Sequence, residues 1–481
     1  MKQNISYCLA FFLLLCMSSP TSAQLGKFTN KLKQTSNKIG RKVSTSQQSS
    51  STKENTPSQE VTGLGEEAPK EYYVSRNTGR GRLATKEQPA KDLGNIIALL
   101  KPGDIIHIAE GEYTSRGDQS ADELNVPVSI IGGYDPTFSI RDPWGKHQTI
   151  FTGIQTLDAL TAPRLYIRTN QTYKAYEGEI VIDGLIVDHG ARNRYKDEKE
   201  LMIVRTGSPK LNQNPTPSSG GIRVLTGKYT NVIIRNCIVM NTAPQEGALS
   251  VQAGENAQVI IQNNLLINNT GNGIQCLTAW YPRDGRGKPK FQVLNNSVLF
   301  TWKPDAIASH SGNALMLDAE IELIAAGNVF GFSDRGGIDN IKKCKTITLK
   351  DNLIVANKKF DYREWNTKMR IDEIEDESDL MSYESTGNIS QLIKVPVSEA
   401  WAAIYAGRKE ISRADVDAQA NAANSDANAL RGMLGLPTQA NSVSLDAAVW
   451  LHRLYIKDAI PTGLRPYLGK YGSRNPQEMK E

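Results

Sequence analysis

The chain has 481 residues and a formal net charge of +5 at pH 7. Residues 1–70 carry nine Lys and Arg against four Glu, which leaves 47 basic and 47 acidic residues in 71–481. A folded part without net charge offers no electrostatic basis for binding nucleic acid, so we exclude that class of partner.

The first 23 residues have the pattern of a cleavable secretory signal. Lys2 precedes an apolar core from Leu9 to Met17, and small residues at Thr21 and Ala23 precede Gln24. This core is too short to span a bilayer, and no later run is long and apolar enough to do so. We expect no membrane span and a location that is secreted, periplasmic or at the cell surface.

Residues 24–70 are rich in Ser, Thr, Gln and Lys and nearly free of aromatic residues. Such a segment cannot bury enough apolar surface to fold alone, which predicts a disordered linker.

The ordered part is predicted to begin at residue 71 with the strand-like "EYYV". In "KDLGNIIALLKPGD" the apolar residues Leu93, Ile96, Ile97 and Leu100 have helical spacing, and Pro102 ends the pattern. The segments "IIHIAEGEYT" and "VPVSIIGGYDP" then read as strands separated by turns. The predicted helix precedes these strands and is suited to cap them.

Two columns of residues repeat through the central region. Turn positions recur at intervals of 27, 32, 32 and 24, and aliphatic positions at intervals of 27, 25, 41 and 23. The first column is Cys237, Asn264, Asn296, Asn328 and Asn352; the second is Ile222, Leu249, Ile274, Leu315 and Ile338. Repeats of about 20 to 30 residues built from strands predict a coil of stacked parallel strands.

The chemistry of the turns agrees with this interpretation. Asn and Gly tolerate the left-handed backbone of a tight bend, and equivalent positions of successive coils stack about 4.8 Å apart. Asparagines in one column can therefore form a hydrogen-bonded ladder while the aliphatic column fills the interior. A leucine-rich repeat is the main alternative, but its Leu-x-x-Leu-x-Leu spacing does not recur.

The sequence resembles right-handed parallel β-helix proteins of the pectin-lyase-like superfamily, especially secreted bacterial members. The resemblance lies in "YYVSRNTGRGRLATKEQPAKDLGNIIALLKPGDIIHIAEGEY" and "VSIIGGYDPTF" and covers roughly residues 72–395. It implies an all-β, three-sheet coil over residues 71–395, closed at its N-terminal end by a helix around Leu93–Leu100. It also implies work outside the cytoplasm, often on carbohydrate.

Residues 396–481 are alanine-rich with helical apolar spacing. An open β-coil exposes an apolar end and unpaired edges, so we predict a helical segment that caps it; a separate binding module is the alternative. The cysteines left after export, Cys237, Cys276 and Cys344, match no disulfide framework or zinc motif and are predicted to be buried.

Three insertions interrupt the repeat, at residues 188–221, 278–290 and 301–313, and insertions in repeat proteins often form the binding face. Aromatic rings stack on sugars and cations pair with acidic groups, so the latter two insertions predict an acidic polysaccharide as the partner. The predicted binding residues in them are Trp280, Tyr281, Arg283, Trp302, Lys303 and Asp305, with Asp339 on a later coil. The alternative is that the tryptophans only pack their loops against the coil.

Aligning the columns places Asp334 and Arg335 one coil beyond the segment from His310 to Gly312. His310 and Asp334 are then predicted within about 5 to 7 Å of each other, given the spacing of stacked strands. We predict a catalytic group in which Asp334 holds His310, His310 transfers a proton and Arg335 binds a carboxylate.

Three functions stay open. A β-elimination on a uronide would use Arg335 for the carboxylate and His310 or Lys303 as the base. A hydrolase would need two carboxylates from Asp305, Asp334 and Asp339. A non-catalytic glycan-binding or cell-surface protein is the third. Calcium is a possible cofactor, although no aspartate array for it is evident, and we expect a monomer.

Overall fold

The computed structural model describes residues 68–115, 121–153, 163–188, 220–242, 246–279, 287–302, 310–357, 359–371, 373, 383–390 and 468–480. All of them belong to one unit, residues 60–481. The predicted signal segment and linker up to residue 67, and most of the predicted C-terminal cap, lie outside the described residues.

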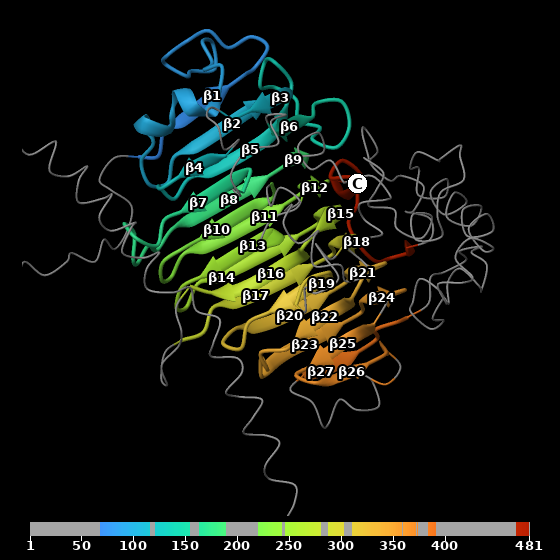
Figure 1. Cartoon of the computed structure of the whole chain (residues 1–481). Helices are drawn as coiled ribbons and strands as arrows, with labels where there is room; N and C mark the ends of the chain where they lie inside the picture. Colours follow the sequence, from blue (N-terminus) through green and yellow to red (C-terminus); the bar gives the residue numbers. More distant parts are fainter. Residues whose placement is uncertain are drawn as a thin grey trace, which may run out of the picture. The chain divides into compact units, whose positions relative to one another are not determined.

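The described chain winds through three sheets, which each full coil visits in turn (Figure 1). Sheet 1 contains β1 (Glu71–Val74), β2 (Ile105–Ala109), β5 (Ser129–Tyr134), β8 (Glu179–Asp183), β11 (Asn231–Arg235), β14 (Gln258–Gln262), β17 (Lys290–Leu294), β20 (Glu322–Ala326), β23 (Thr346–Lys350) and β27 (Tyr383–Thr386). Sheet 2 contains β3 (Gly111–Thr114), β6 (Thr149–Thr152), β9 (Leu185–Asp188), β12 (Ile238–Met240), β15 (Leu265–Thr270), β18 (Ser297–Trp302), β21 (Val329–Gly331) and β24 (Leu353–Val355). Sheet 3 contains β4 (Asp122–Leu124), β7 (Leu165–Arg168), β10 (Ile222–Leu225), β13 (Gly247–Ala253), β16 (Asn272–Thr278), β19 (Asn313–Leu317), β22 (Gly336–Asn340), β25 (Phe360–Glu364) and β26 (Thr367–Met369).

All neighbouring strands are parallel except β25 and β26, which form an antiparallel pair at the end of sheet 3. Strands that are neighbours in a sheet are about one coil apart in the sequence. The fold is therefore a right-handed parallel β-helix, and the predicted fold class is confirmed.

The aliphatic column lies in the core, with the register that the repeat predicted. Each member pairs with the next across sheet 3, and all are at most 1% exposed. Leu165 extends the column by one coil at its start, and Tyr362 extends it at its end. The 41-residue interval does not shift the register, because Ile274 still pairs with Leu315.

The asparagine ladder is also confirmed, and it continues to Asn388. In each step the side-chain oxygen of one asparagine accepts from the backbone N–H and side-chain amide of the asparagine one coil before, at 2.8–3.0 Å. Asn264, Asn296, Asn328 and Asn352 are fully buried. The ladder thus satisfies polar groups that the coil removes from water.

The residue before each ladder position has a left-handed backbone. The φ angles lie between 50° and 67° at Asn236, Asn263, Asn295, Gly327, Asp351 and Gly387. Only Gly, Asn and Asp occur there, the residue types that adopt this conformation at low cost. This column turns the chain from sheet 1 into sheet 2 in the coils from β11 to β24.

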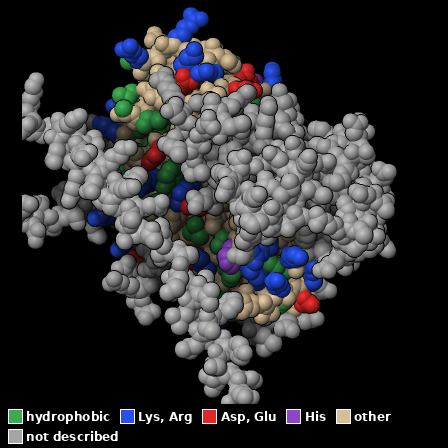
Figure 2. Space-filling model, viewed as in Figure 1, with side chains coloured by type: hydrophobic (Ala, Val, Ile, Leu, Met, Phe, Trp, Pro, Cys, Tyr) green, Lys and Arg blue, Asp and Glu red, His purple; other side chains and the backbone are tan. Residues whose placement is uncertain are grey.

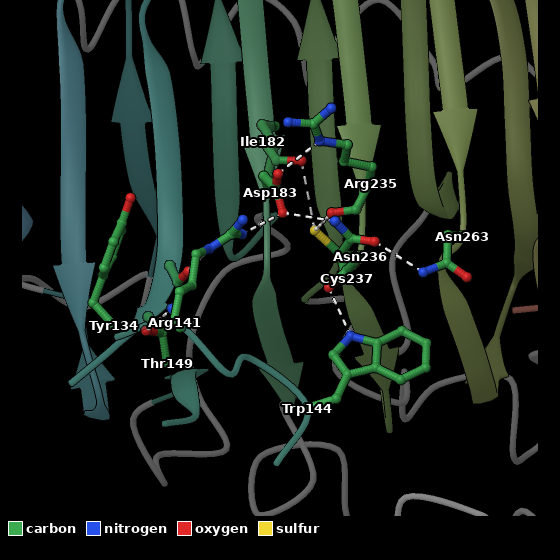
Figure 3. Close-up of polar contacts among 12 residues, drawn as sticks. Tyr134, Arg141, Trp144, Thr149, Ile182, Asp183, Arg235, Asn236, Cys237 and Asn263 are labelled. Carbon is green, nitrogen blue, oxygen red and sulfur yellow. Dashed lines mark hydrogen bonds and ion pairs between the residues drawn. The ribbon is translucent and has the colours of Figure 1, made fainter. Parts of the chain in front are cut away.

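Asp183 anchors the turn that follows β8, as Figure 3 shows. It forms ion pairs with Arg141 and Arg235 and accepts a hydrogen bond from the Asn236 side chain at 3.0 Å. Burial alone would raise the pKa of Asp183, but its hydrogen bond and ion pair with Arg141, helped by Asn236 and Arg235, hold the pKa below its ordinary value. Trp144 donates to the Asn236 carbonyl at 2.7 Å, which ties an earlier loop to the same turn.

The prediction of an α-helix that caps the N-terminal end is wrong. The segment forms two 3-10 turns, η1 (Leu93–Asn95) and η2 (Ile97–Leu99). Gly94 is a poor helix former, and the segment is too short to offset this. Leu93, Ile96 and Leu100 are nevertheless buried in the core cluster.

The described C-terminal tail, residues 468–480, lies along the side of the coil. Its Lys470 pairs with Asp351 at 3.2 Å, the Gly472 N–H donates to Gly327 O at 2.7 Å, and the Arg474 N–H donates to the Asn263 side chain at 2.7 Å. Successive tail residues thus contact successively earlier coils; η7 (Glu478–Lys480) ends the tail. The predicted capping role of residues 396–467 concerns residues outside those described.

The three cysteines are free and fully buried, as predicted. Burial raises the pKa of Cys237 to about 12 and that of Cys344 to about 11, and it also raises that of Cys276. None of these thiols is an activated nucleophile. In the part of the chain that the structure describes, no helix is long and apolar enough to cross a membrane.

Candidate functional site

The outer face of sheet 3 carries a row of side chains that alternate with the core column. Strand pairing places one member on each coil, so neighbours in the row lie about 4.8 Å apart at the backbone. The row reads Tyr166, Arg223, Ser250, Gln275, Met316, Asp339 and Arg363. It therefore combines charged, polar and aromatic groups on one face.

His310 precedes β19 and is exposed. Its carbonyl oxygen accepts from the side-chain amides of Asn272 at 3.2 Å and Asn313 at 3.4 Å, which fix the backbone at this point. Partial burial, with the positive charges of Arg335 and Arg363, lowers the pKa of His310 below its ordinary value. Its imidazole is thus neutral at pH 7 and able to accept a proton.

Arg335 lies one coil beyond Gly312, since its N–H donates to Gly312 O at 2.9 Å. The side chain is half-buried, and its guanidinium lies 5.9 Å from the centre of the Phe360 ring. Burial lowers the pKa of Arg335, and the charge of Arg363 lowers it further. No carboxylate among the described residues forms an ion pair with it, so its charge is available to an anionic ligand.

Asp339 and Arg363 form a bidentate pair next to Arg335. Arg363 donates to both carboxylate oxygens, at 2.8 and 2.5 Å, and Asn313 donates to one of them at 3.0 Å. Asp339 is fully buried, and Arg363 is 5% exposed. The charge of Asp339 is therefore paired with Arg363, and this buried pair has a structural role beside Arg335.

Asp334 is buried, and its N–H donates to Thr301 O at 2.8 Å. Trp302 ends β18, where it pairs with Thr270 through the backbone. The side chain of Trp302, and all of Trp280, Tyr281, Arg283, Lys303 and Asp305, lie outside the described residues.

A second charged group occurs on earlier coils of the same face. Glu246 precedes β13 and pairs with Arg223 of β10 at 2.7 Å. Burial raises the pKa of Glu246, although the positive charge of Arg223 opposes this rise.

Two glycines separate Glu246 from Arg335 along the coil axis. Gly247 pairs with Asn272, the Gly312 N–H donates to Gly271 O, and the Arg335 N–H donates to Gly312 O. Glu246, Gly271, Gly312 and Arg335 thus stack on successive coils, over about 14 Å in three strand spacings. The two middle positions have no side chains, and φ angles of 111° and 89° require glycine there.

Sequence reasoning missed Arg363, Phe360, Arg223 and Glu246. The aliphatic column contained a signal for two of them. Extending it by one coil beyond Ile338 places Tyr362 in the core and Arg363 beside Asp339, and extending the outer row backwards from Ser250 reaches Arg223.

Figure 2 shows Lys and Arg side chains (blue) gathered around a histidine (purple) in the lower half of the view. The coils of β22 and β25 supply many described cations, among them Arg335, Lys342, Lys343, Lys359, Arg363 and Arg370. Among the described residues no group of three or more His, Cys, Asp or Glu side chains could hold a metal ion.

Comparisons with known proteins give structural likeness alone. No family model matches the chain, and no curated protein matches it. A pectate lyase structure, Pel9A, is 11% identical, with 74% of this chain and 85% of that chain covered and a TM-score of 0.29. A rhamnogalacturonan lyase is 11% identical, with 84% and 99% covered and a TM-score of 0.27. A complex of XylC with xylose is 10% identical, with 61% and 70% covered and a TM-score of 0.19. The fold assignment rests on the three parallel sheets, and the resemblance seen in the sequence is confirmed at the level of the fold.

Proposed function

We propose that this protein acts on an acidic polysaccharide at the outer face of sheet 3, by β-elimination. Arg335 binds the carboxylate of a uronate sugar, and His310 is the catalytic base. One observation carries the proposal: a half-buried guanidinium, without an ion-pair partner among the described residues, lies within electrostatic range of a histidine with a lowered pKa.

The chemistry requires a cation and a base together. Arg335 neutralises the carboxylate, which acidifies the adjacent ring C–H. His310 accepts that proton, the electron pair of the broken C–H bond forms the new C=C bond, and the glycosidic oxygen leaves with the electrons of its C–O bond and takes a proton from water. The products are one unsaturated sugar end and one new reducing end.

Hydrolysis has less support than elimination. It needs one carboxyl group as an acid and a second as a nucleophile or base. Both oxygens of Asp339 are bound by Arg363, so recruiting this carboxylate would break a buried ion pair.

Binding without cleavage is the second candidate, because the free charge of Arg335 would serve it equally well. The proposal also includes export, with residues 1–23 removed and the mature protein acting outside the cytoplasm. N-terminal sequencing of the exported protein tests this part: a start at Gln24 supports it, and a retained Met1 contradicts it.

The test of catalysis uses purified protein with polygalacturonate, alginate and hyaluronate as separate substrates. Ultraviolet absorbance of unsaturated products and new reducing ends are measured together. We expect both signals with at least one polymer, and neither in His310→Ala, which should still bind that polymer. If His310→Ala produces the same ultraviolet absorbance as wild type, His310 has no role in the mechanism.

Arg335→Ala tests the anion site in the same assay. We expect at least tenfold weaker binding, because the variant lacks the charge that pairs with the carboxylate. Lys290→Ala is the matched control, since it removes an exposed cation from sheet 1. Equal binding by Arg335→Ala and Lys290→Ala would contradict the proposal, and binding without either cleavage signal would assign the protein to the non-catalytic class.

A further inference from the structure

The ion pair between Arg223 and Glu246 lies at the other end of the face from Arg335. The two side chains are 27% and 31% exposed, so a ligand on the face can reach them. Arg223 also covers the ring of Tyr166, with 5.1 Å from the guanidinium carbon to the ring centre. This part of the face contains one positive and one negative charge and is neutral overall.

Three buried polar atoms, two of this pair and one of neighbouring Ser250, have no hydrogen-bond partner among the described residues. They are Arg223 Nε, Glu246 Oε2 and Ser250 Oγ. Ser250 is 1% exposed, and it pairs with Arg223 across β10 and β13 with its side chain on the outer face, between the core residues Leu249 and Val251. Each unsatisfied group costs about 1–3 kcal/mol, so a polar partner shared by all three, either a ligand or water, would stabilise this part of the face.

The three unpaired atoms determine which hydrogen-bonding groups the ligand must have. Arg223 Nε is a donor, Glu246 Oε2 is an acceptor, and the Ser250 hydroxyl is both. Neighbouring hydroxyl groups of a sugar provide donors and acceptors together without adding charge. A second acidic group would instead meet the carboxylate of Glu246 and be repelled.

We propose that Arg223, Glu246 and Ser250 form a second binding subsite, which takes the hydroxyl groups of an uncharged sugar. This deepens the proposed function and rests on it, because the same glycan places its uronate at Arg335. Glu246 and Arg335 are about 14 Å apart at the backbone, three strand spacings, and only Gly271 and Gly312 lie between them in that column. The substrate is therefore a polysaccharide that contains both neutral and acidic sugars.

Calorimetry with two probes tests the subsite in the full-length protein. One probe is a short oligosaccharide of uronate alone, and the other is a longer oligosaccharide that alternates uronate with a neutral sugar. We expect wild type to bind the alternating probe at least tenfold more tightly. Ser250→Val should remove that advantage and leave binding of the uronate probe unchanged.

Glu246→Gln is the second variant, because it keeps the side-chain shape while changing an acceptor into a donor. This variant should also weaken binding of the alternating probe and leave binding of the uronate probe unchanged. The melting temperature of the variant shows whether it is folded. Thr348→Val on sheet 1 is the matched control, since it removes a partly exposed hydroxyl from another sheet.

The outcomes separate the two proposals. If Arg335→Ala binds neither probe while Ser250→Val and Glu246→Gln bind both as wild type does, the subsite alone is overturned. The three unpaired atoms are then assigned to bound water. Unchanged binding of both probes in Arg335→Ala would overturn the proposed function itself.

Discussion

At the scale of single residues, several buried carboxylates among the described residues are matched by arginines within the coil, whereas the half-buried Arg335 has no carboxylate partner there. Asp183 is paired with Arg141 and Arg235, and Asp339 is paired with Arg363. The guanidinium of Arg335 lies over the Phe360 ring, and no carboxylate among the described residues forms an ion pair with it. Because removing a charge from water is costly unless it gains a partner, this contrast marks Arg335 as a charge suited to a ligand.

Asp183→Asn should lower the free energy of unfolding by about 2–4 kcal/mol at pH 7, since the variant leaves two arginines without their shared carboxylate. The pKa of Asp183 is lower in the folded chain than in the unfolded chain. Its contribution is thus complete above the ordinary Asp pKa of about 4 and is lost as the pH falls further, through the folded pKa. Denaturant unfolding at pH 7 and at several pH values below about 4 measures both effects.

The control is Asp351→Asn, which affects an exposed pair with Lys470 and should change stability by less than about 0.5 kcal/mol. A difference between Asp183→Asn and wild type that stays constant into the acid range would contradict the assignment of this charge.

His310 gives a prediction for the pH dependence of activity. Its pKa is lowered by partial burial and by Arg335 and Arg363, so the proposed base should stay deprotonated to lower pH than an ordinary histidine. Arg335→Gln removes one of these charges and should move the acid limb of the pH–rate profile to higher pH. Lys290→Gln on sheet 1 should leave the limb in place. A limb that moves to lower pH in Arg335→Gln would exclude His310 as the base.

At the scale of elements, the C-terminal tail holds several coils together although it belongs to none of them. Gly472 has a φ of 77°, and a Cβ atom there would lie 2.4 Å from Ser297 Oγ and 2.8 Å from a methyl group of Val329. Gly472→Val should therefore release the tail and cost about 2 kcal/mol of unfolding free energy.

Two measurements check the tail. Denaturant unfolding gives the loss of stability, and limited proteolysis shows whether residues 468–480 become cleavable. Lys470→Ala is the control, because its exposed ion pair contributes little. An uncleaved tail in Gly472→Val with wild-type stability would show that these contacts do not hold it.

Element by element, the sequence predicted what depends on local chemistry. Asn264 and Ile274 could be placed because turn conformation and core alternation restrict the residue types at those positions. The helix at Leu93 was wrong because helical spacing also fits two 3-10 turns once Gly94 interrupts the segment. The pair of Arg223 with Glu246 could not be predicted, since it joins two coils through long side chains whose direction no repeat pattern records.

At the scale of the whole molecule, the asparagine ladder links all coils from Cys237 to Asn388 into one array. Asn296→Ala would leave the buried Asn264 N–H and Ile261 O without partners, at a cost of about 3–5 kcal/mol. Asn295→Gly is the control, because glycine occupies the same turn position in two later coils. Urea unfolding compares the two; equal stability would mean that the ladder adds nothing to the coil.

We propose that register along sheet 3 gathers distant residues into one glycan-binding face. A crystal structure of the protein with an acidic oligosaccharide tests it most directly. We expect a uronate carboxylate within hydrogen-bond distance of the Arg335 guanidinium, and a sugar chain that crosses β19 and β16 toward Ser250. A glycan bound to another sheet, without contact to Arg335, would exclude sheet 3 as the binding face.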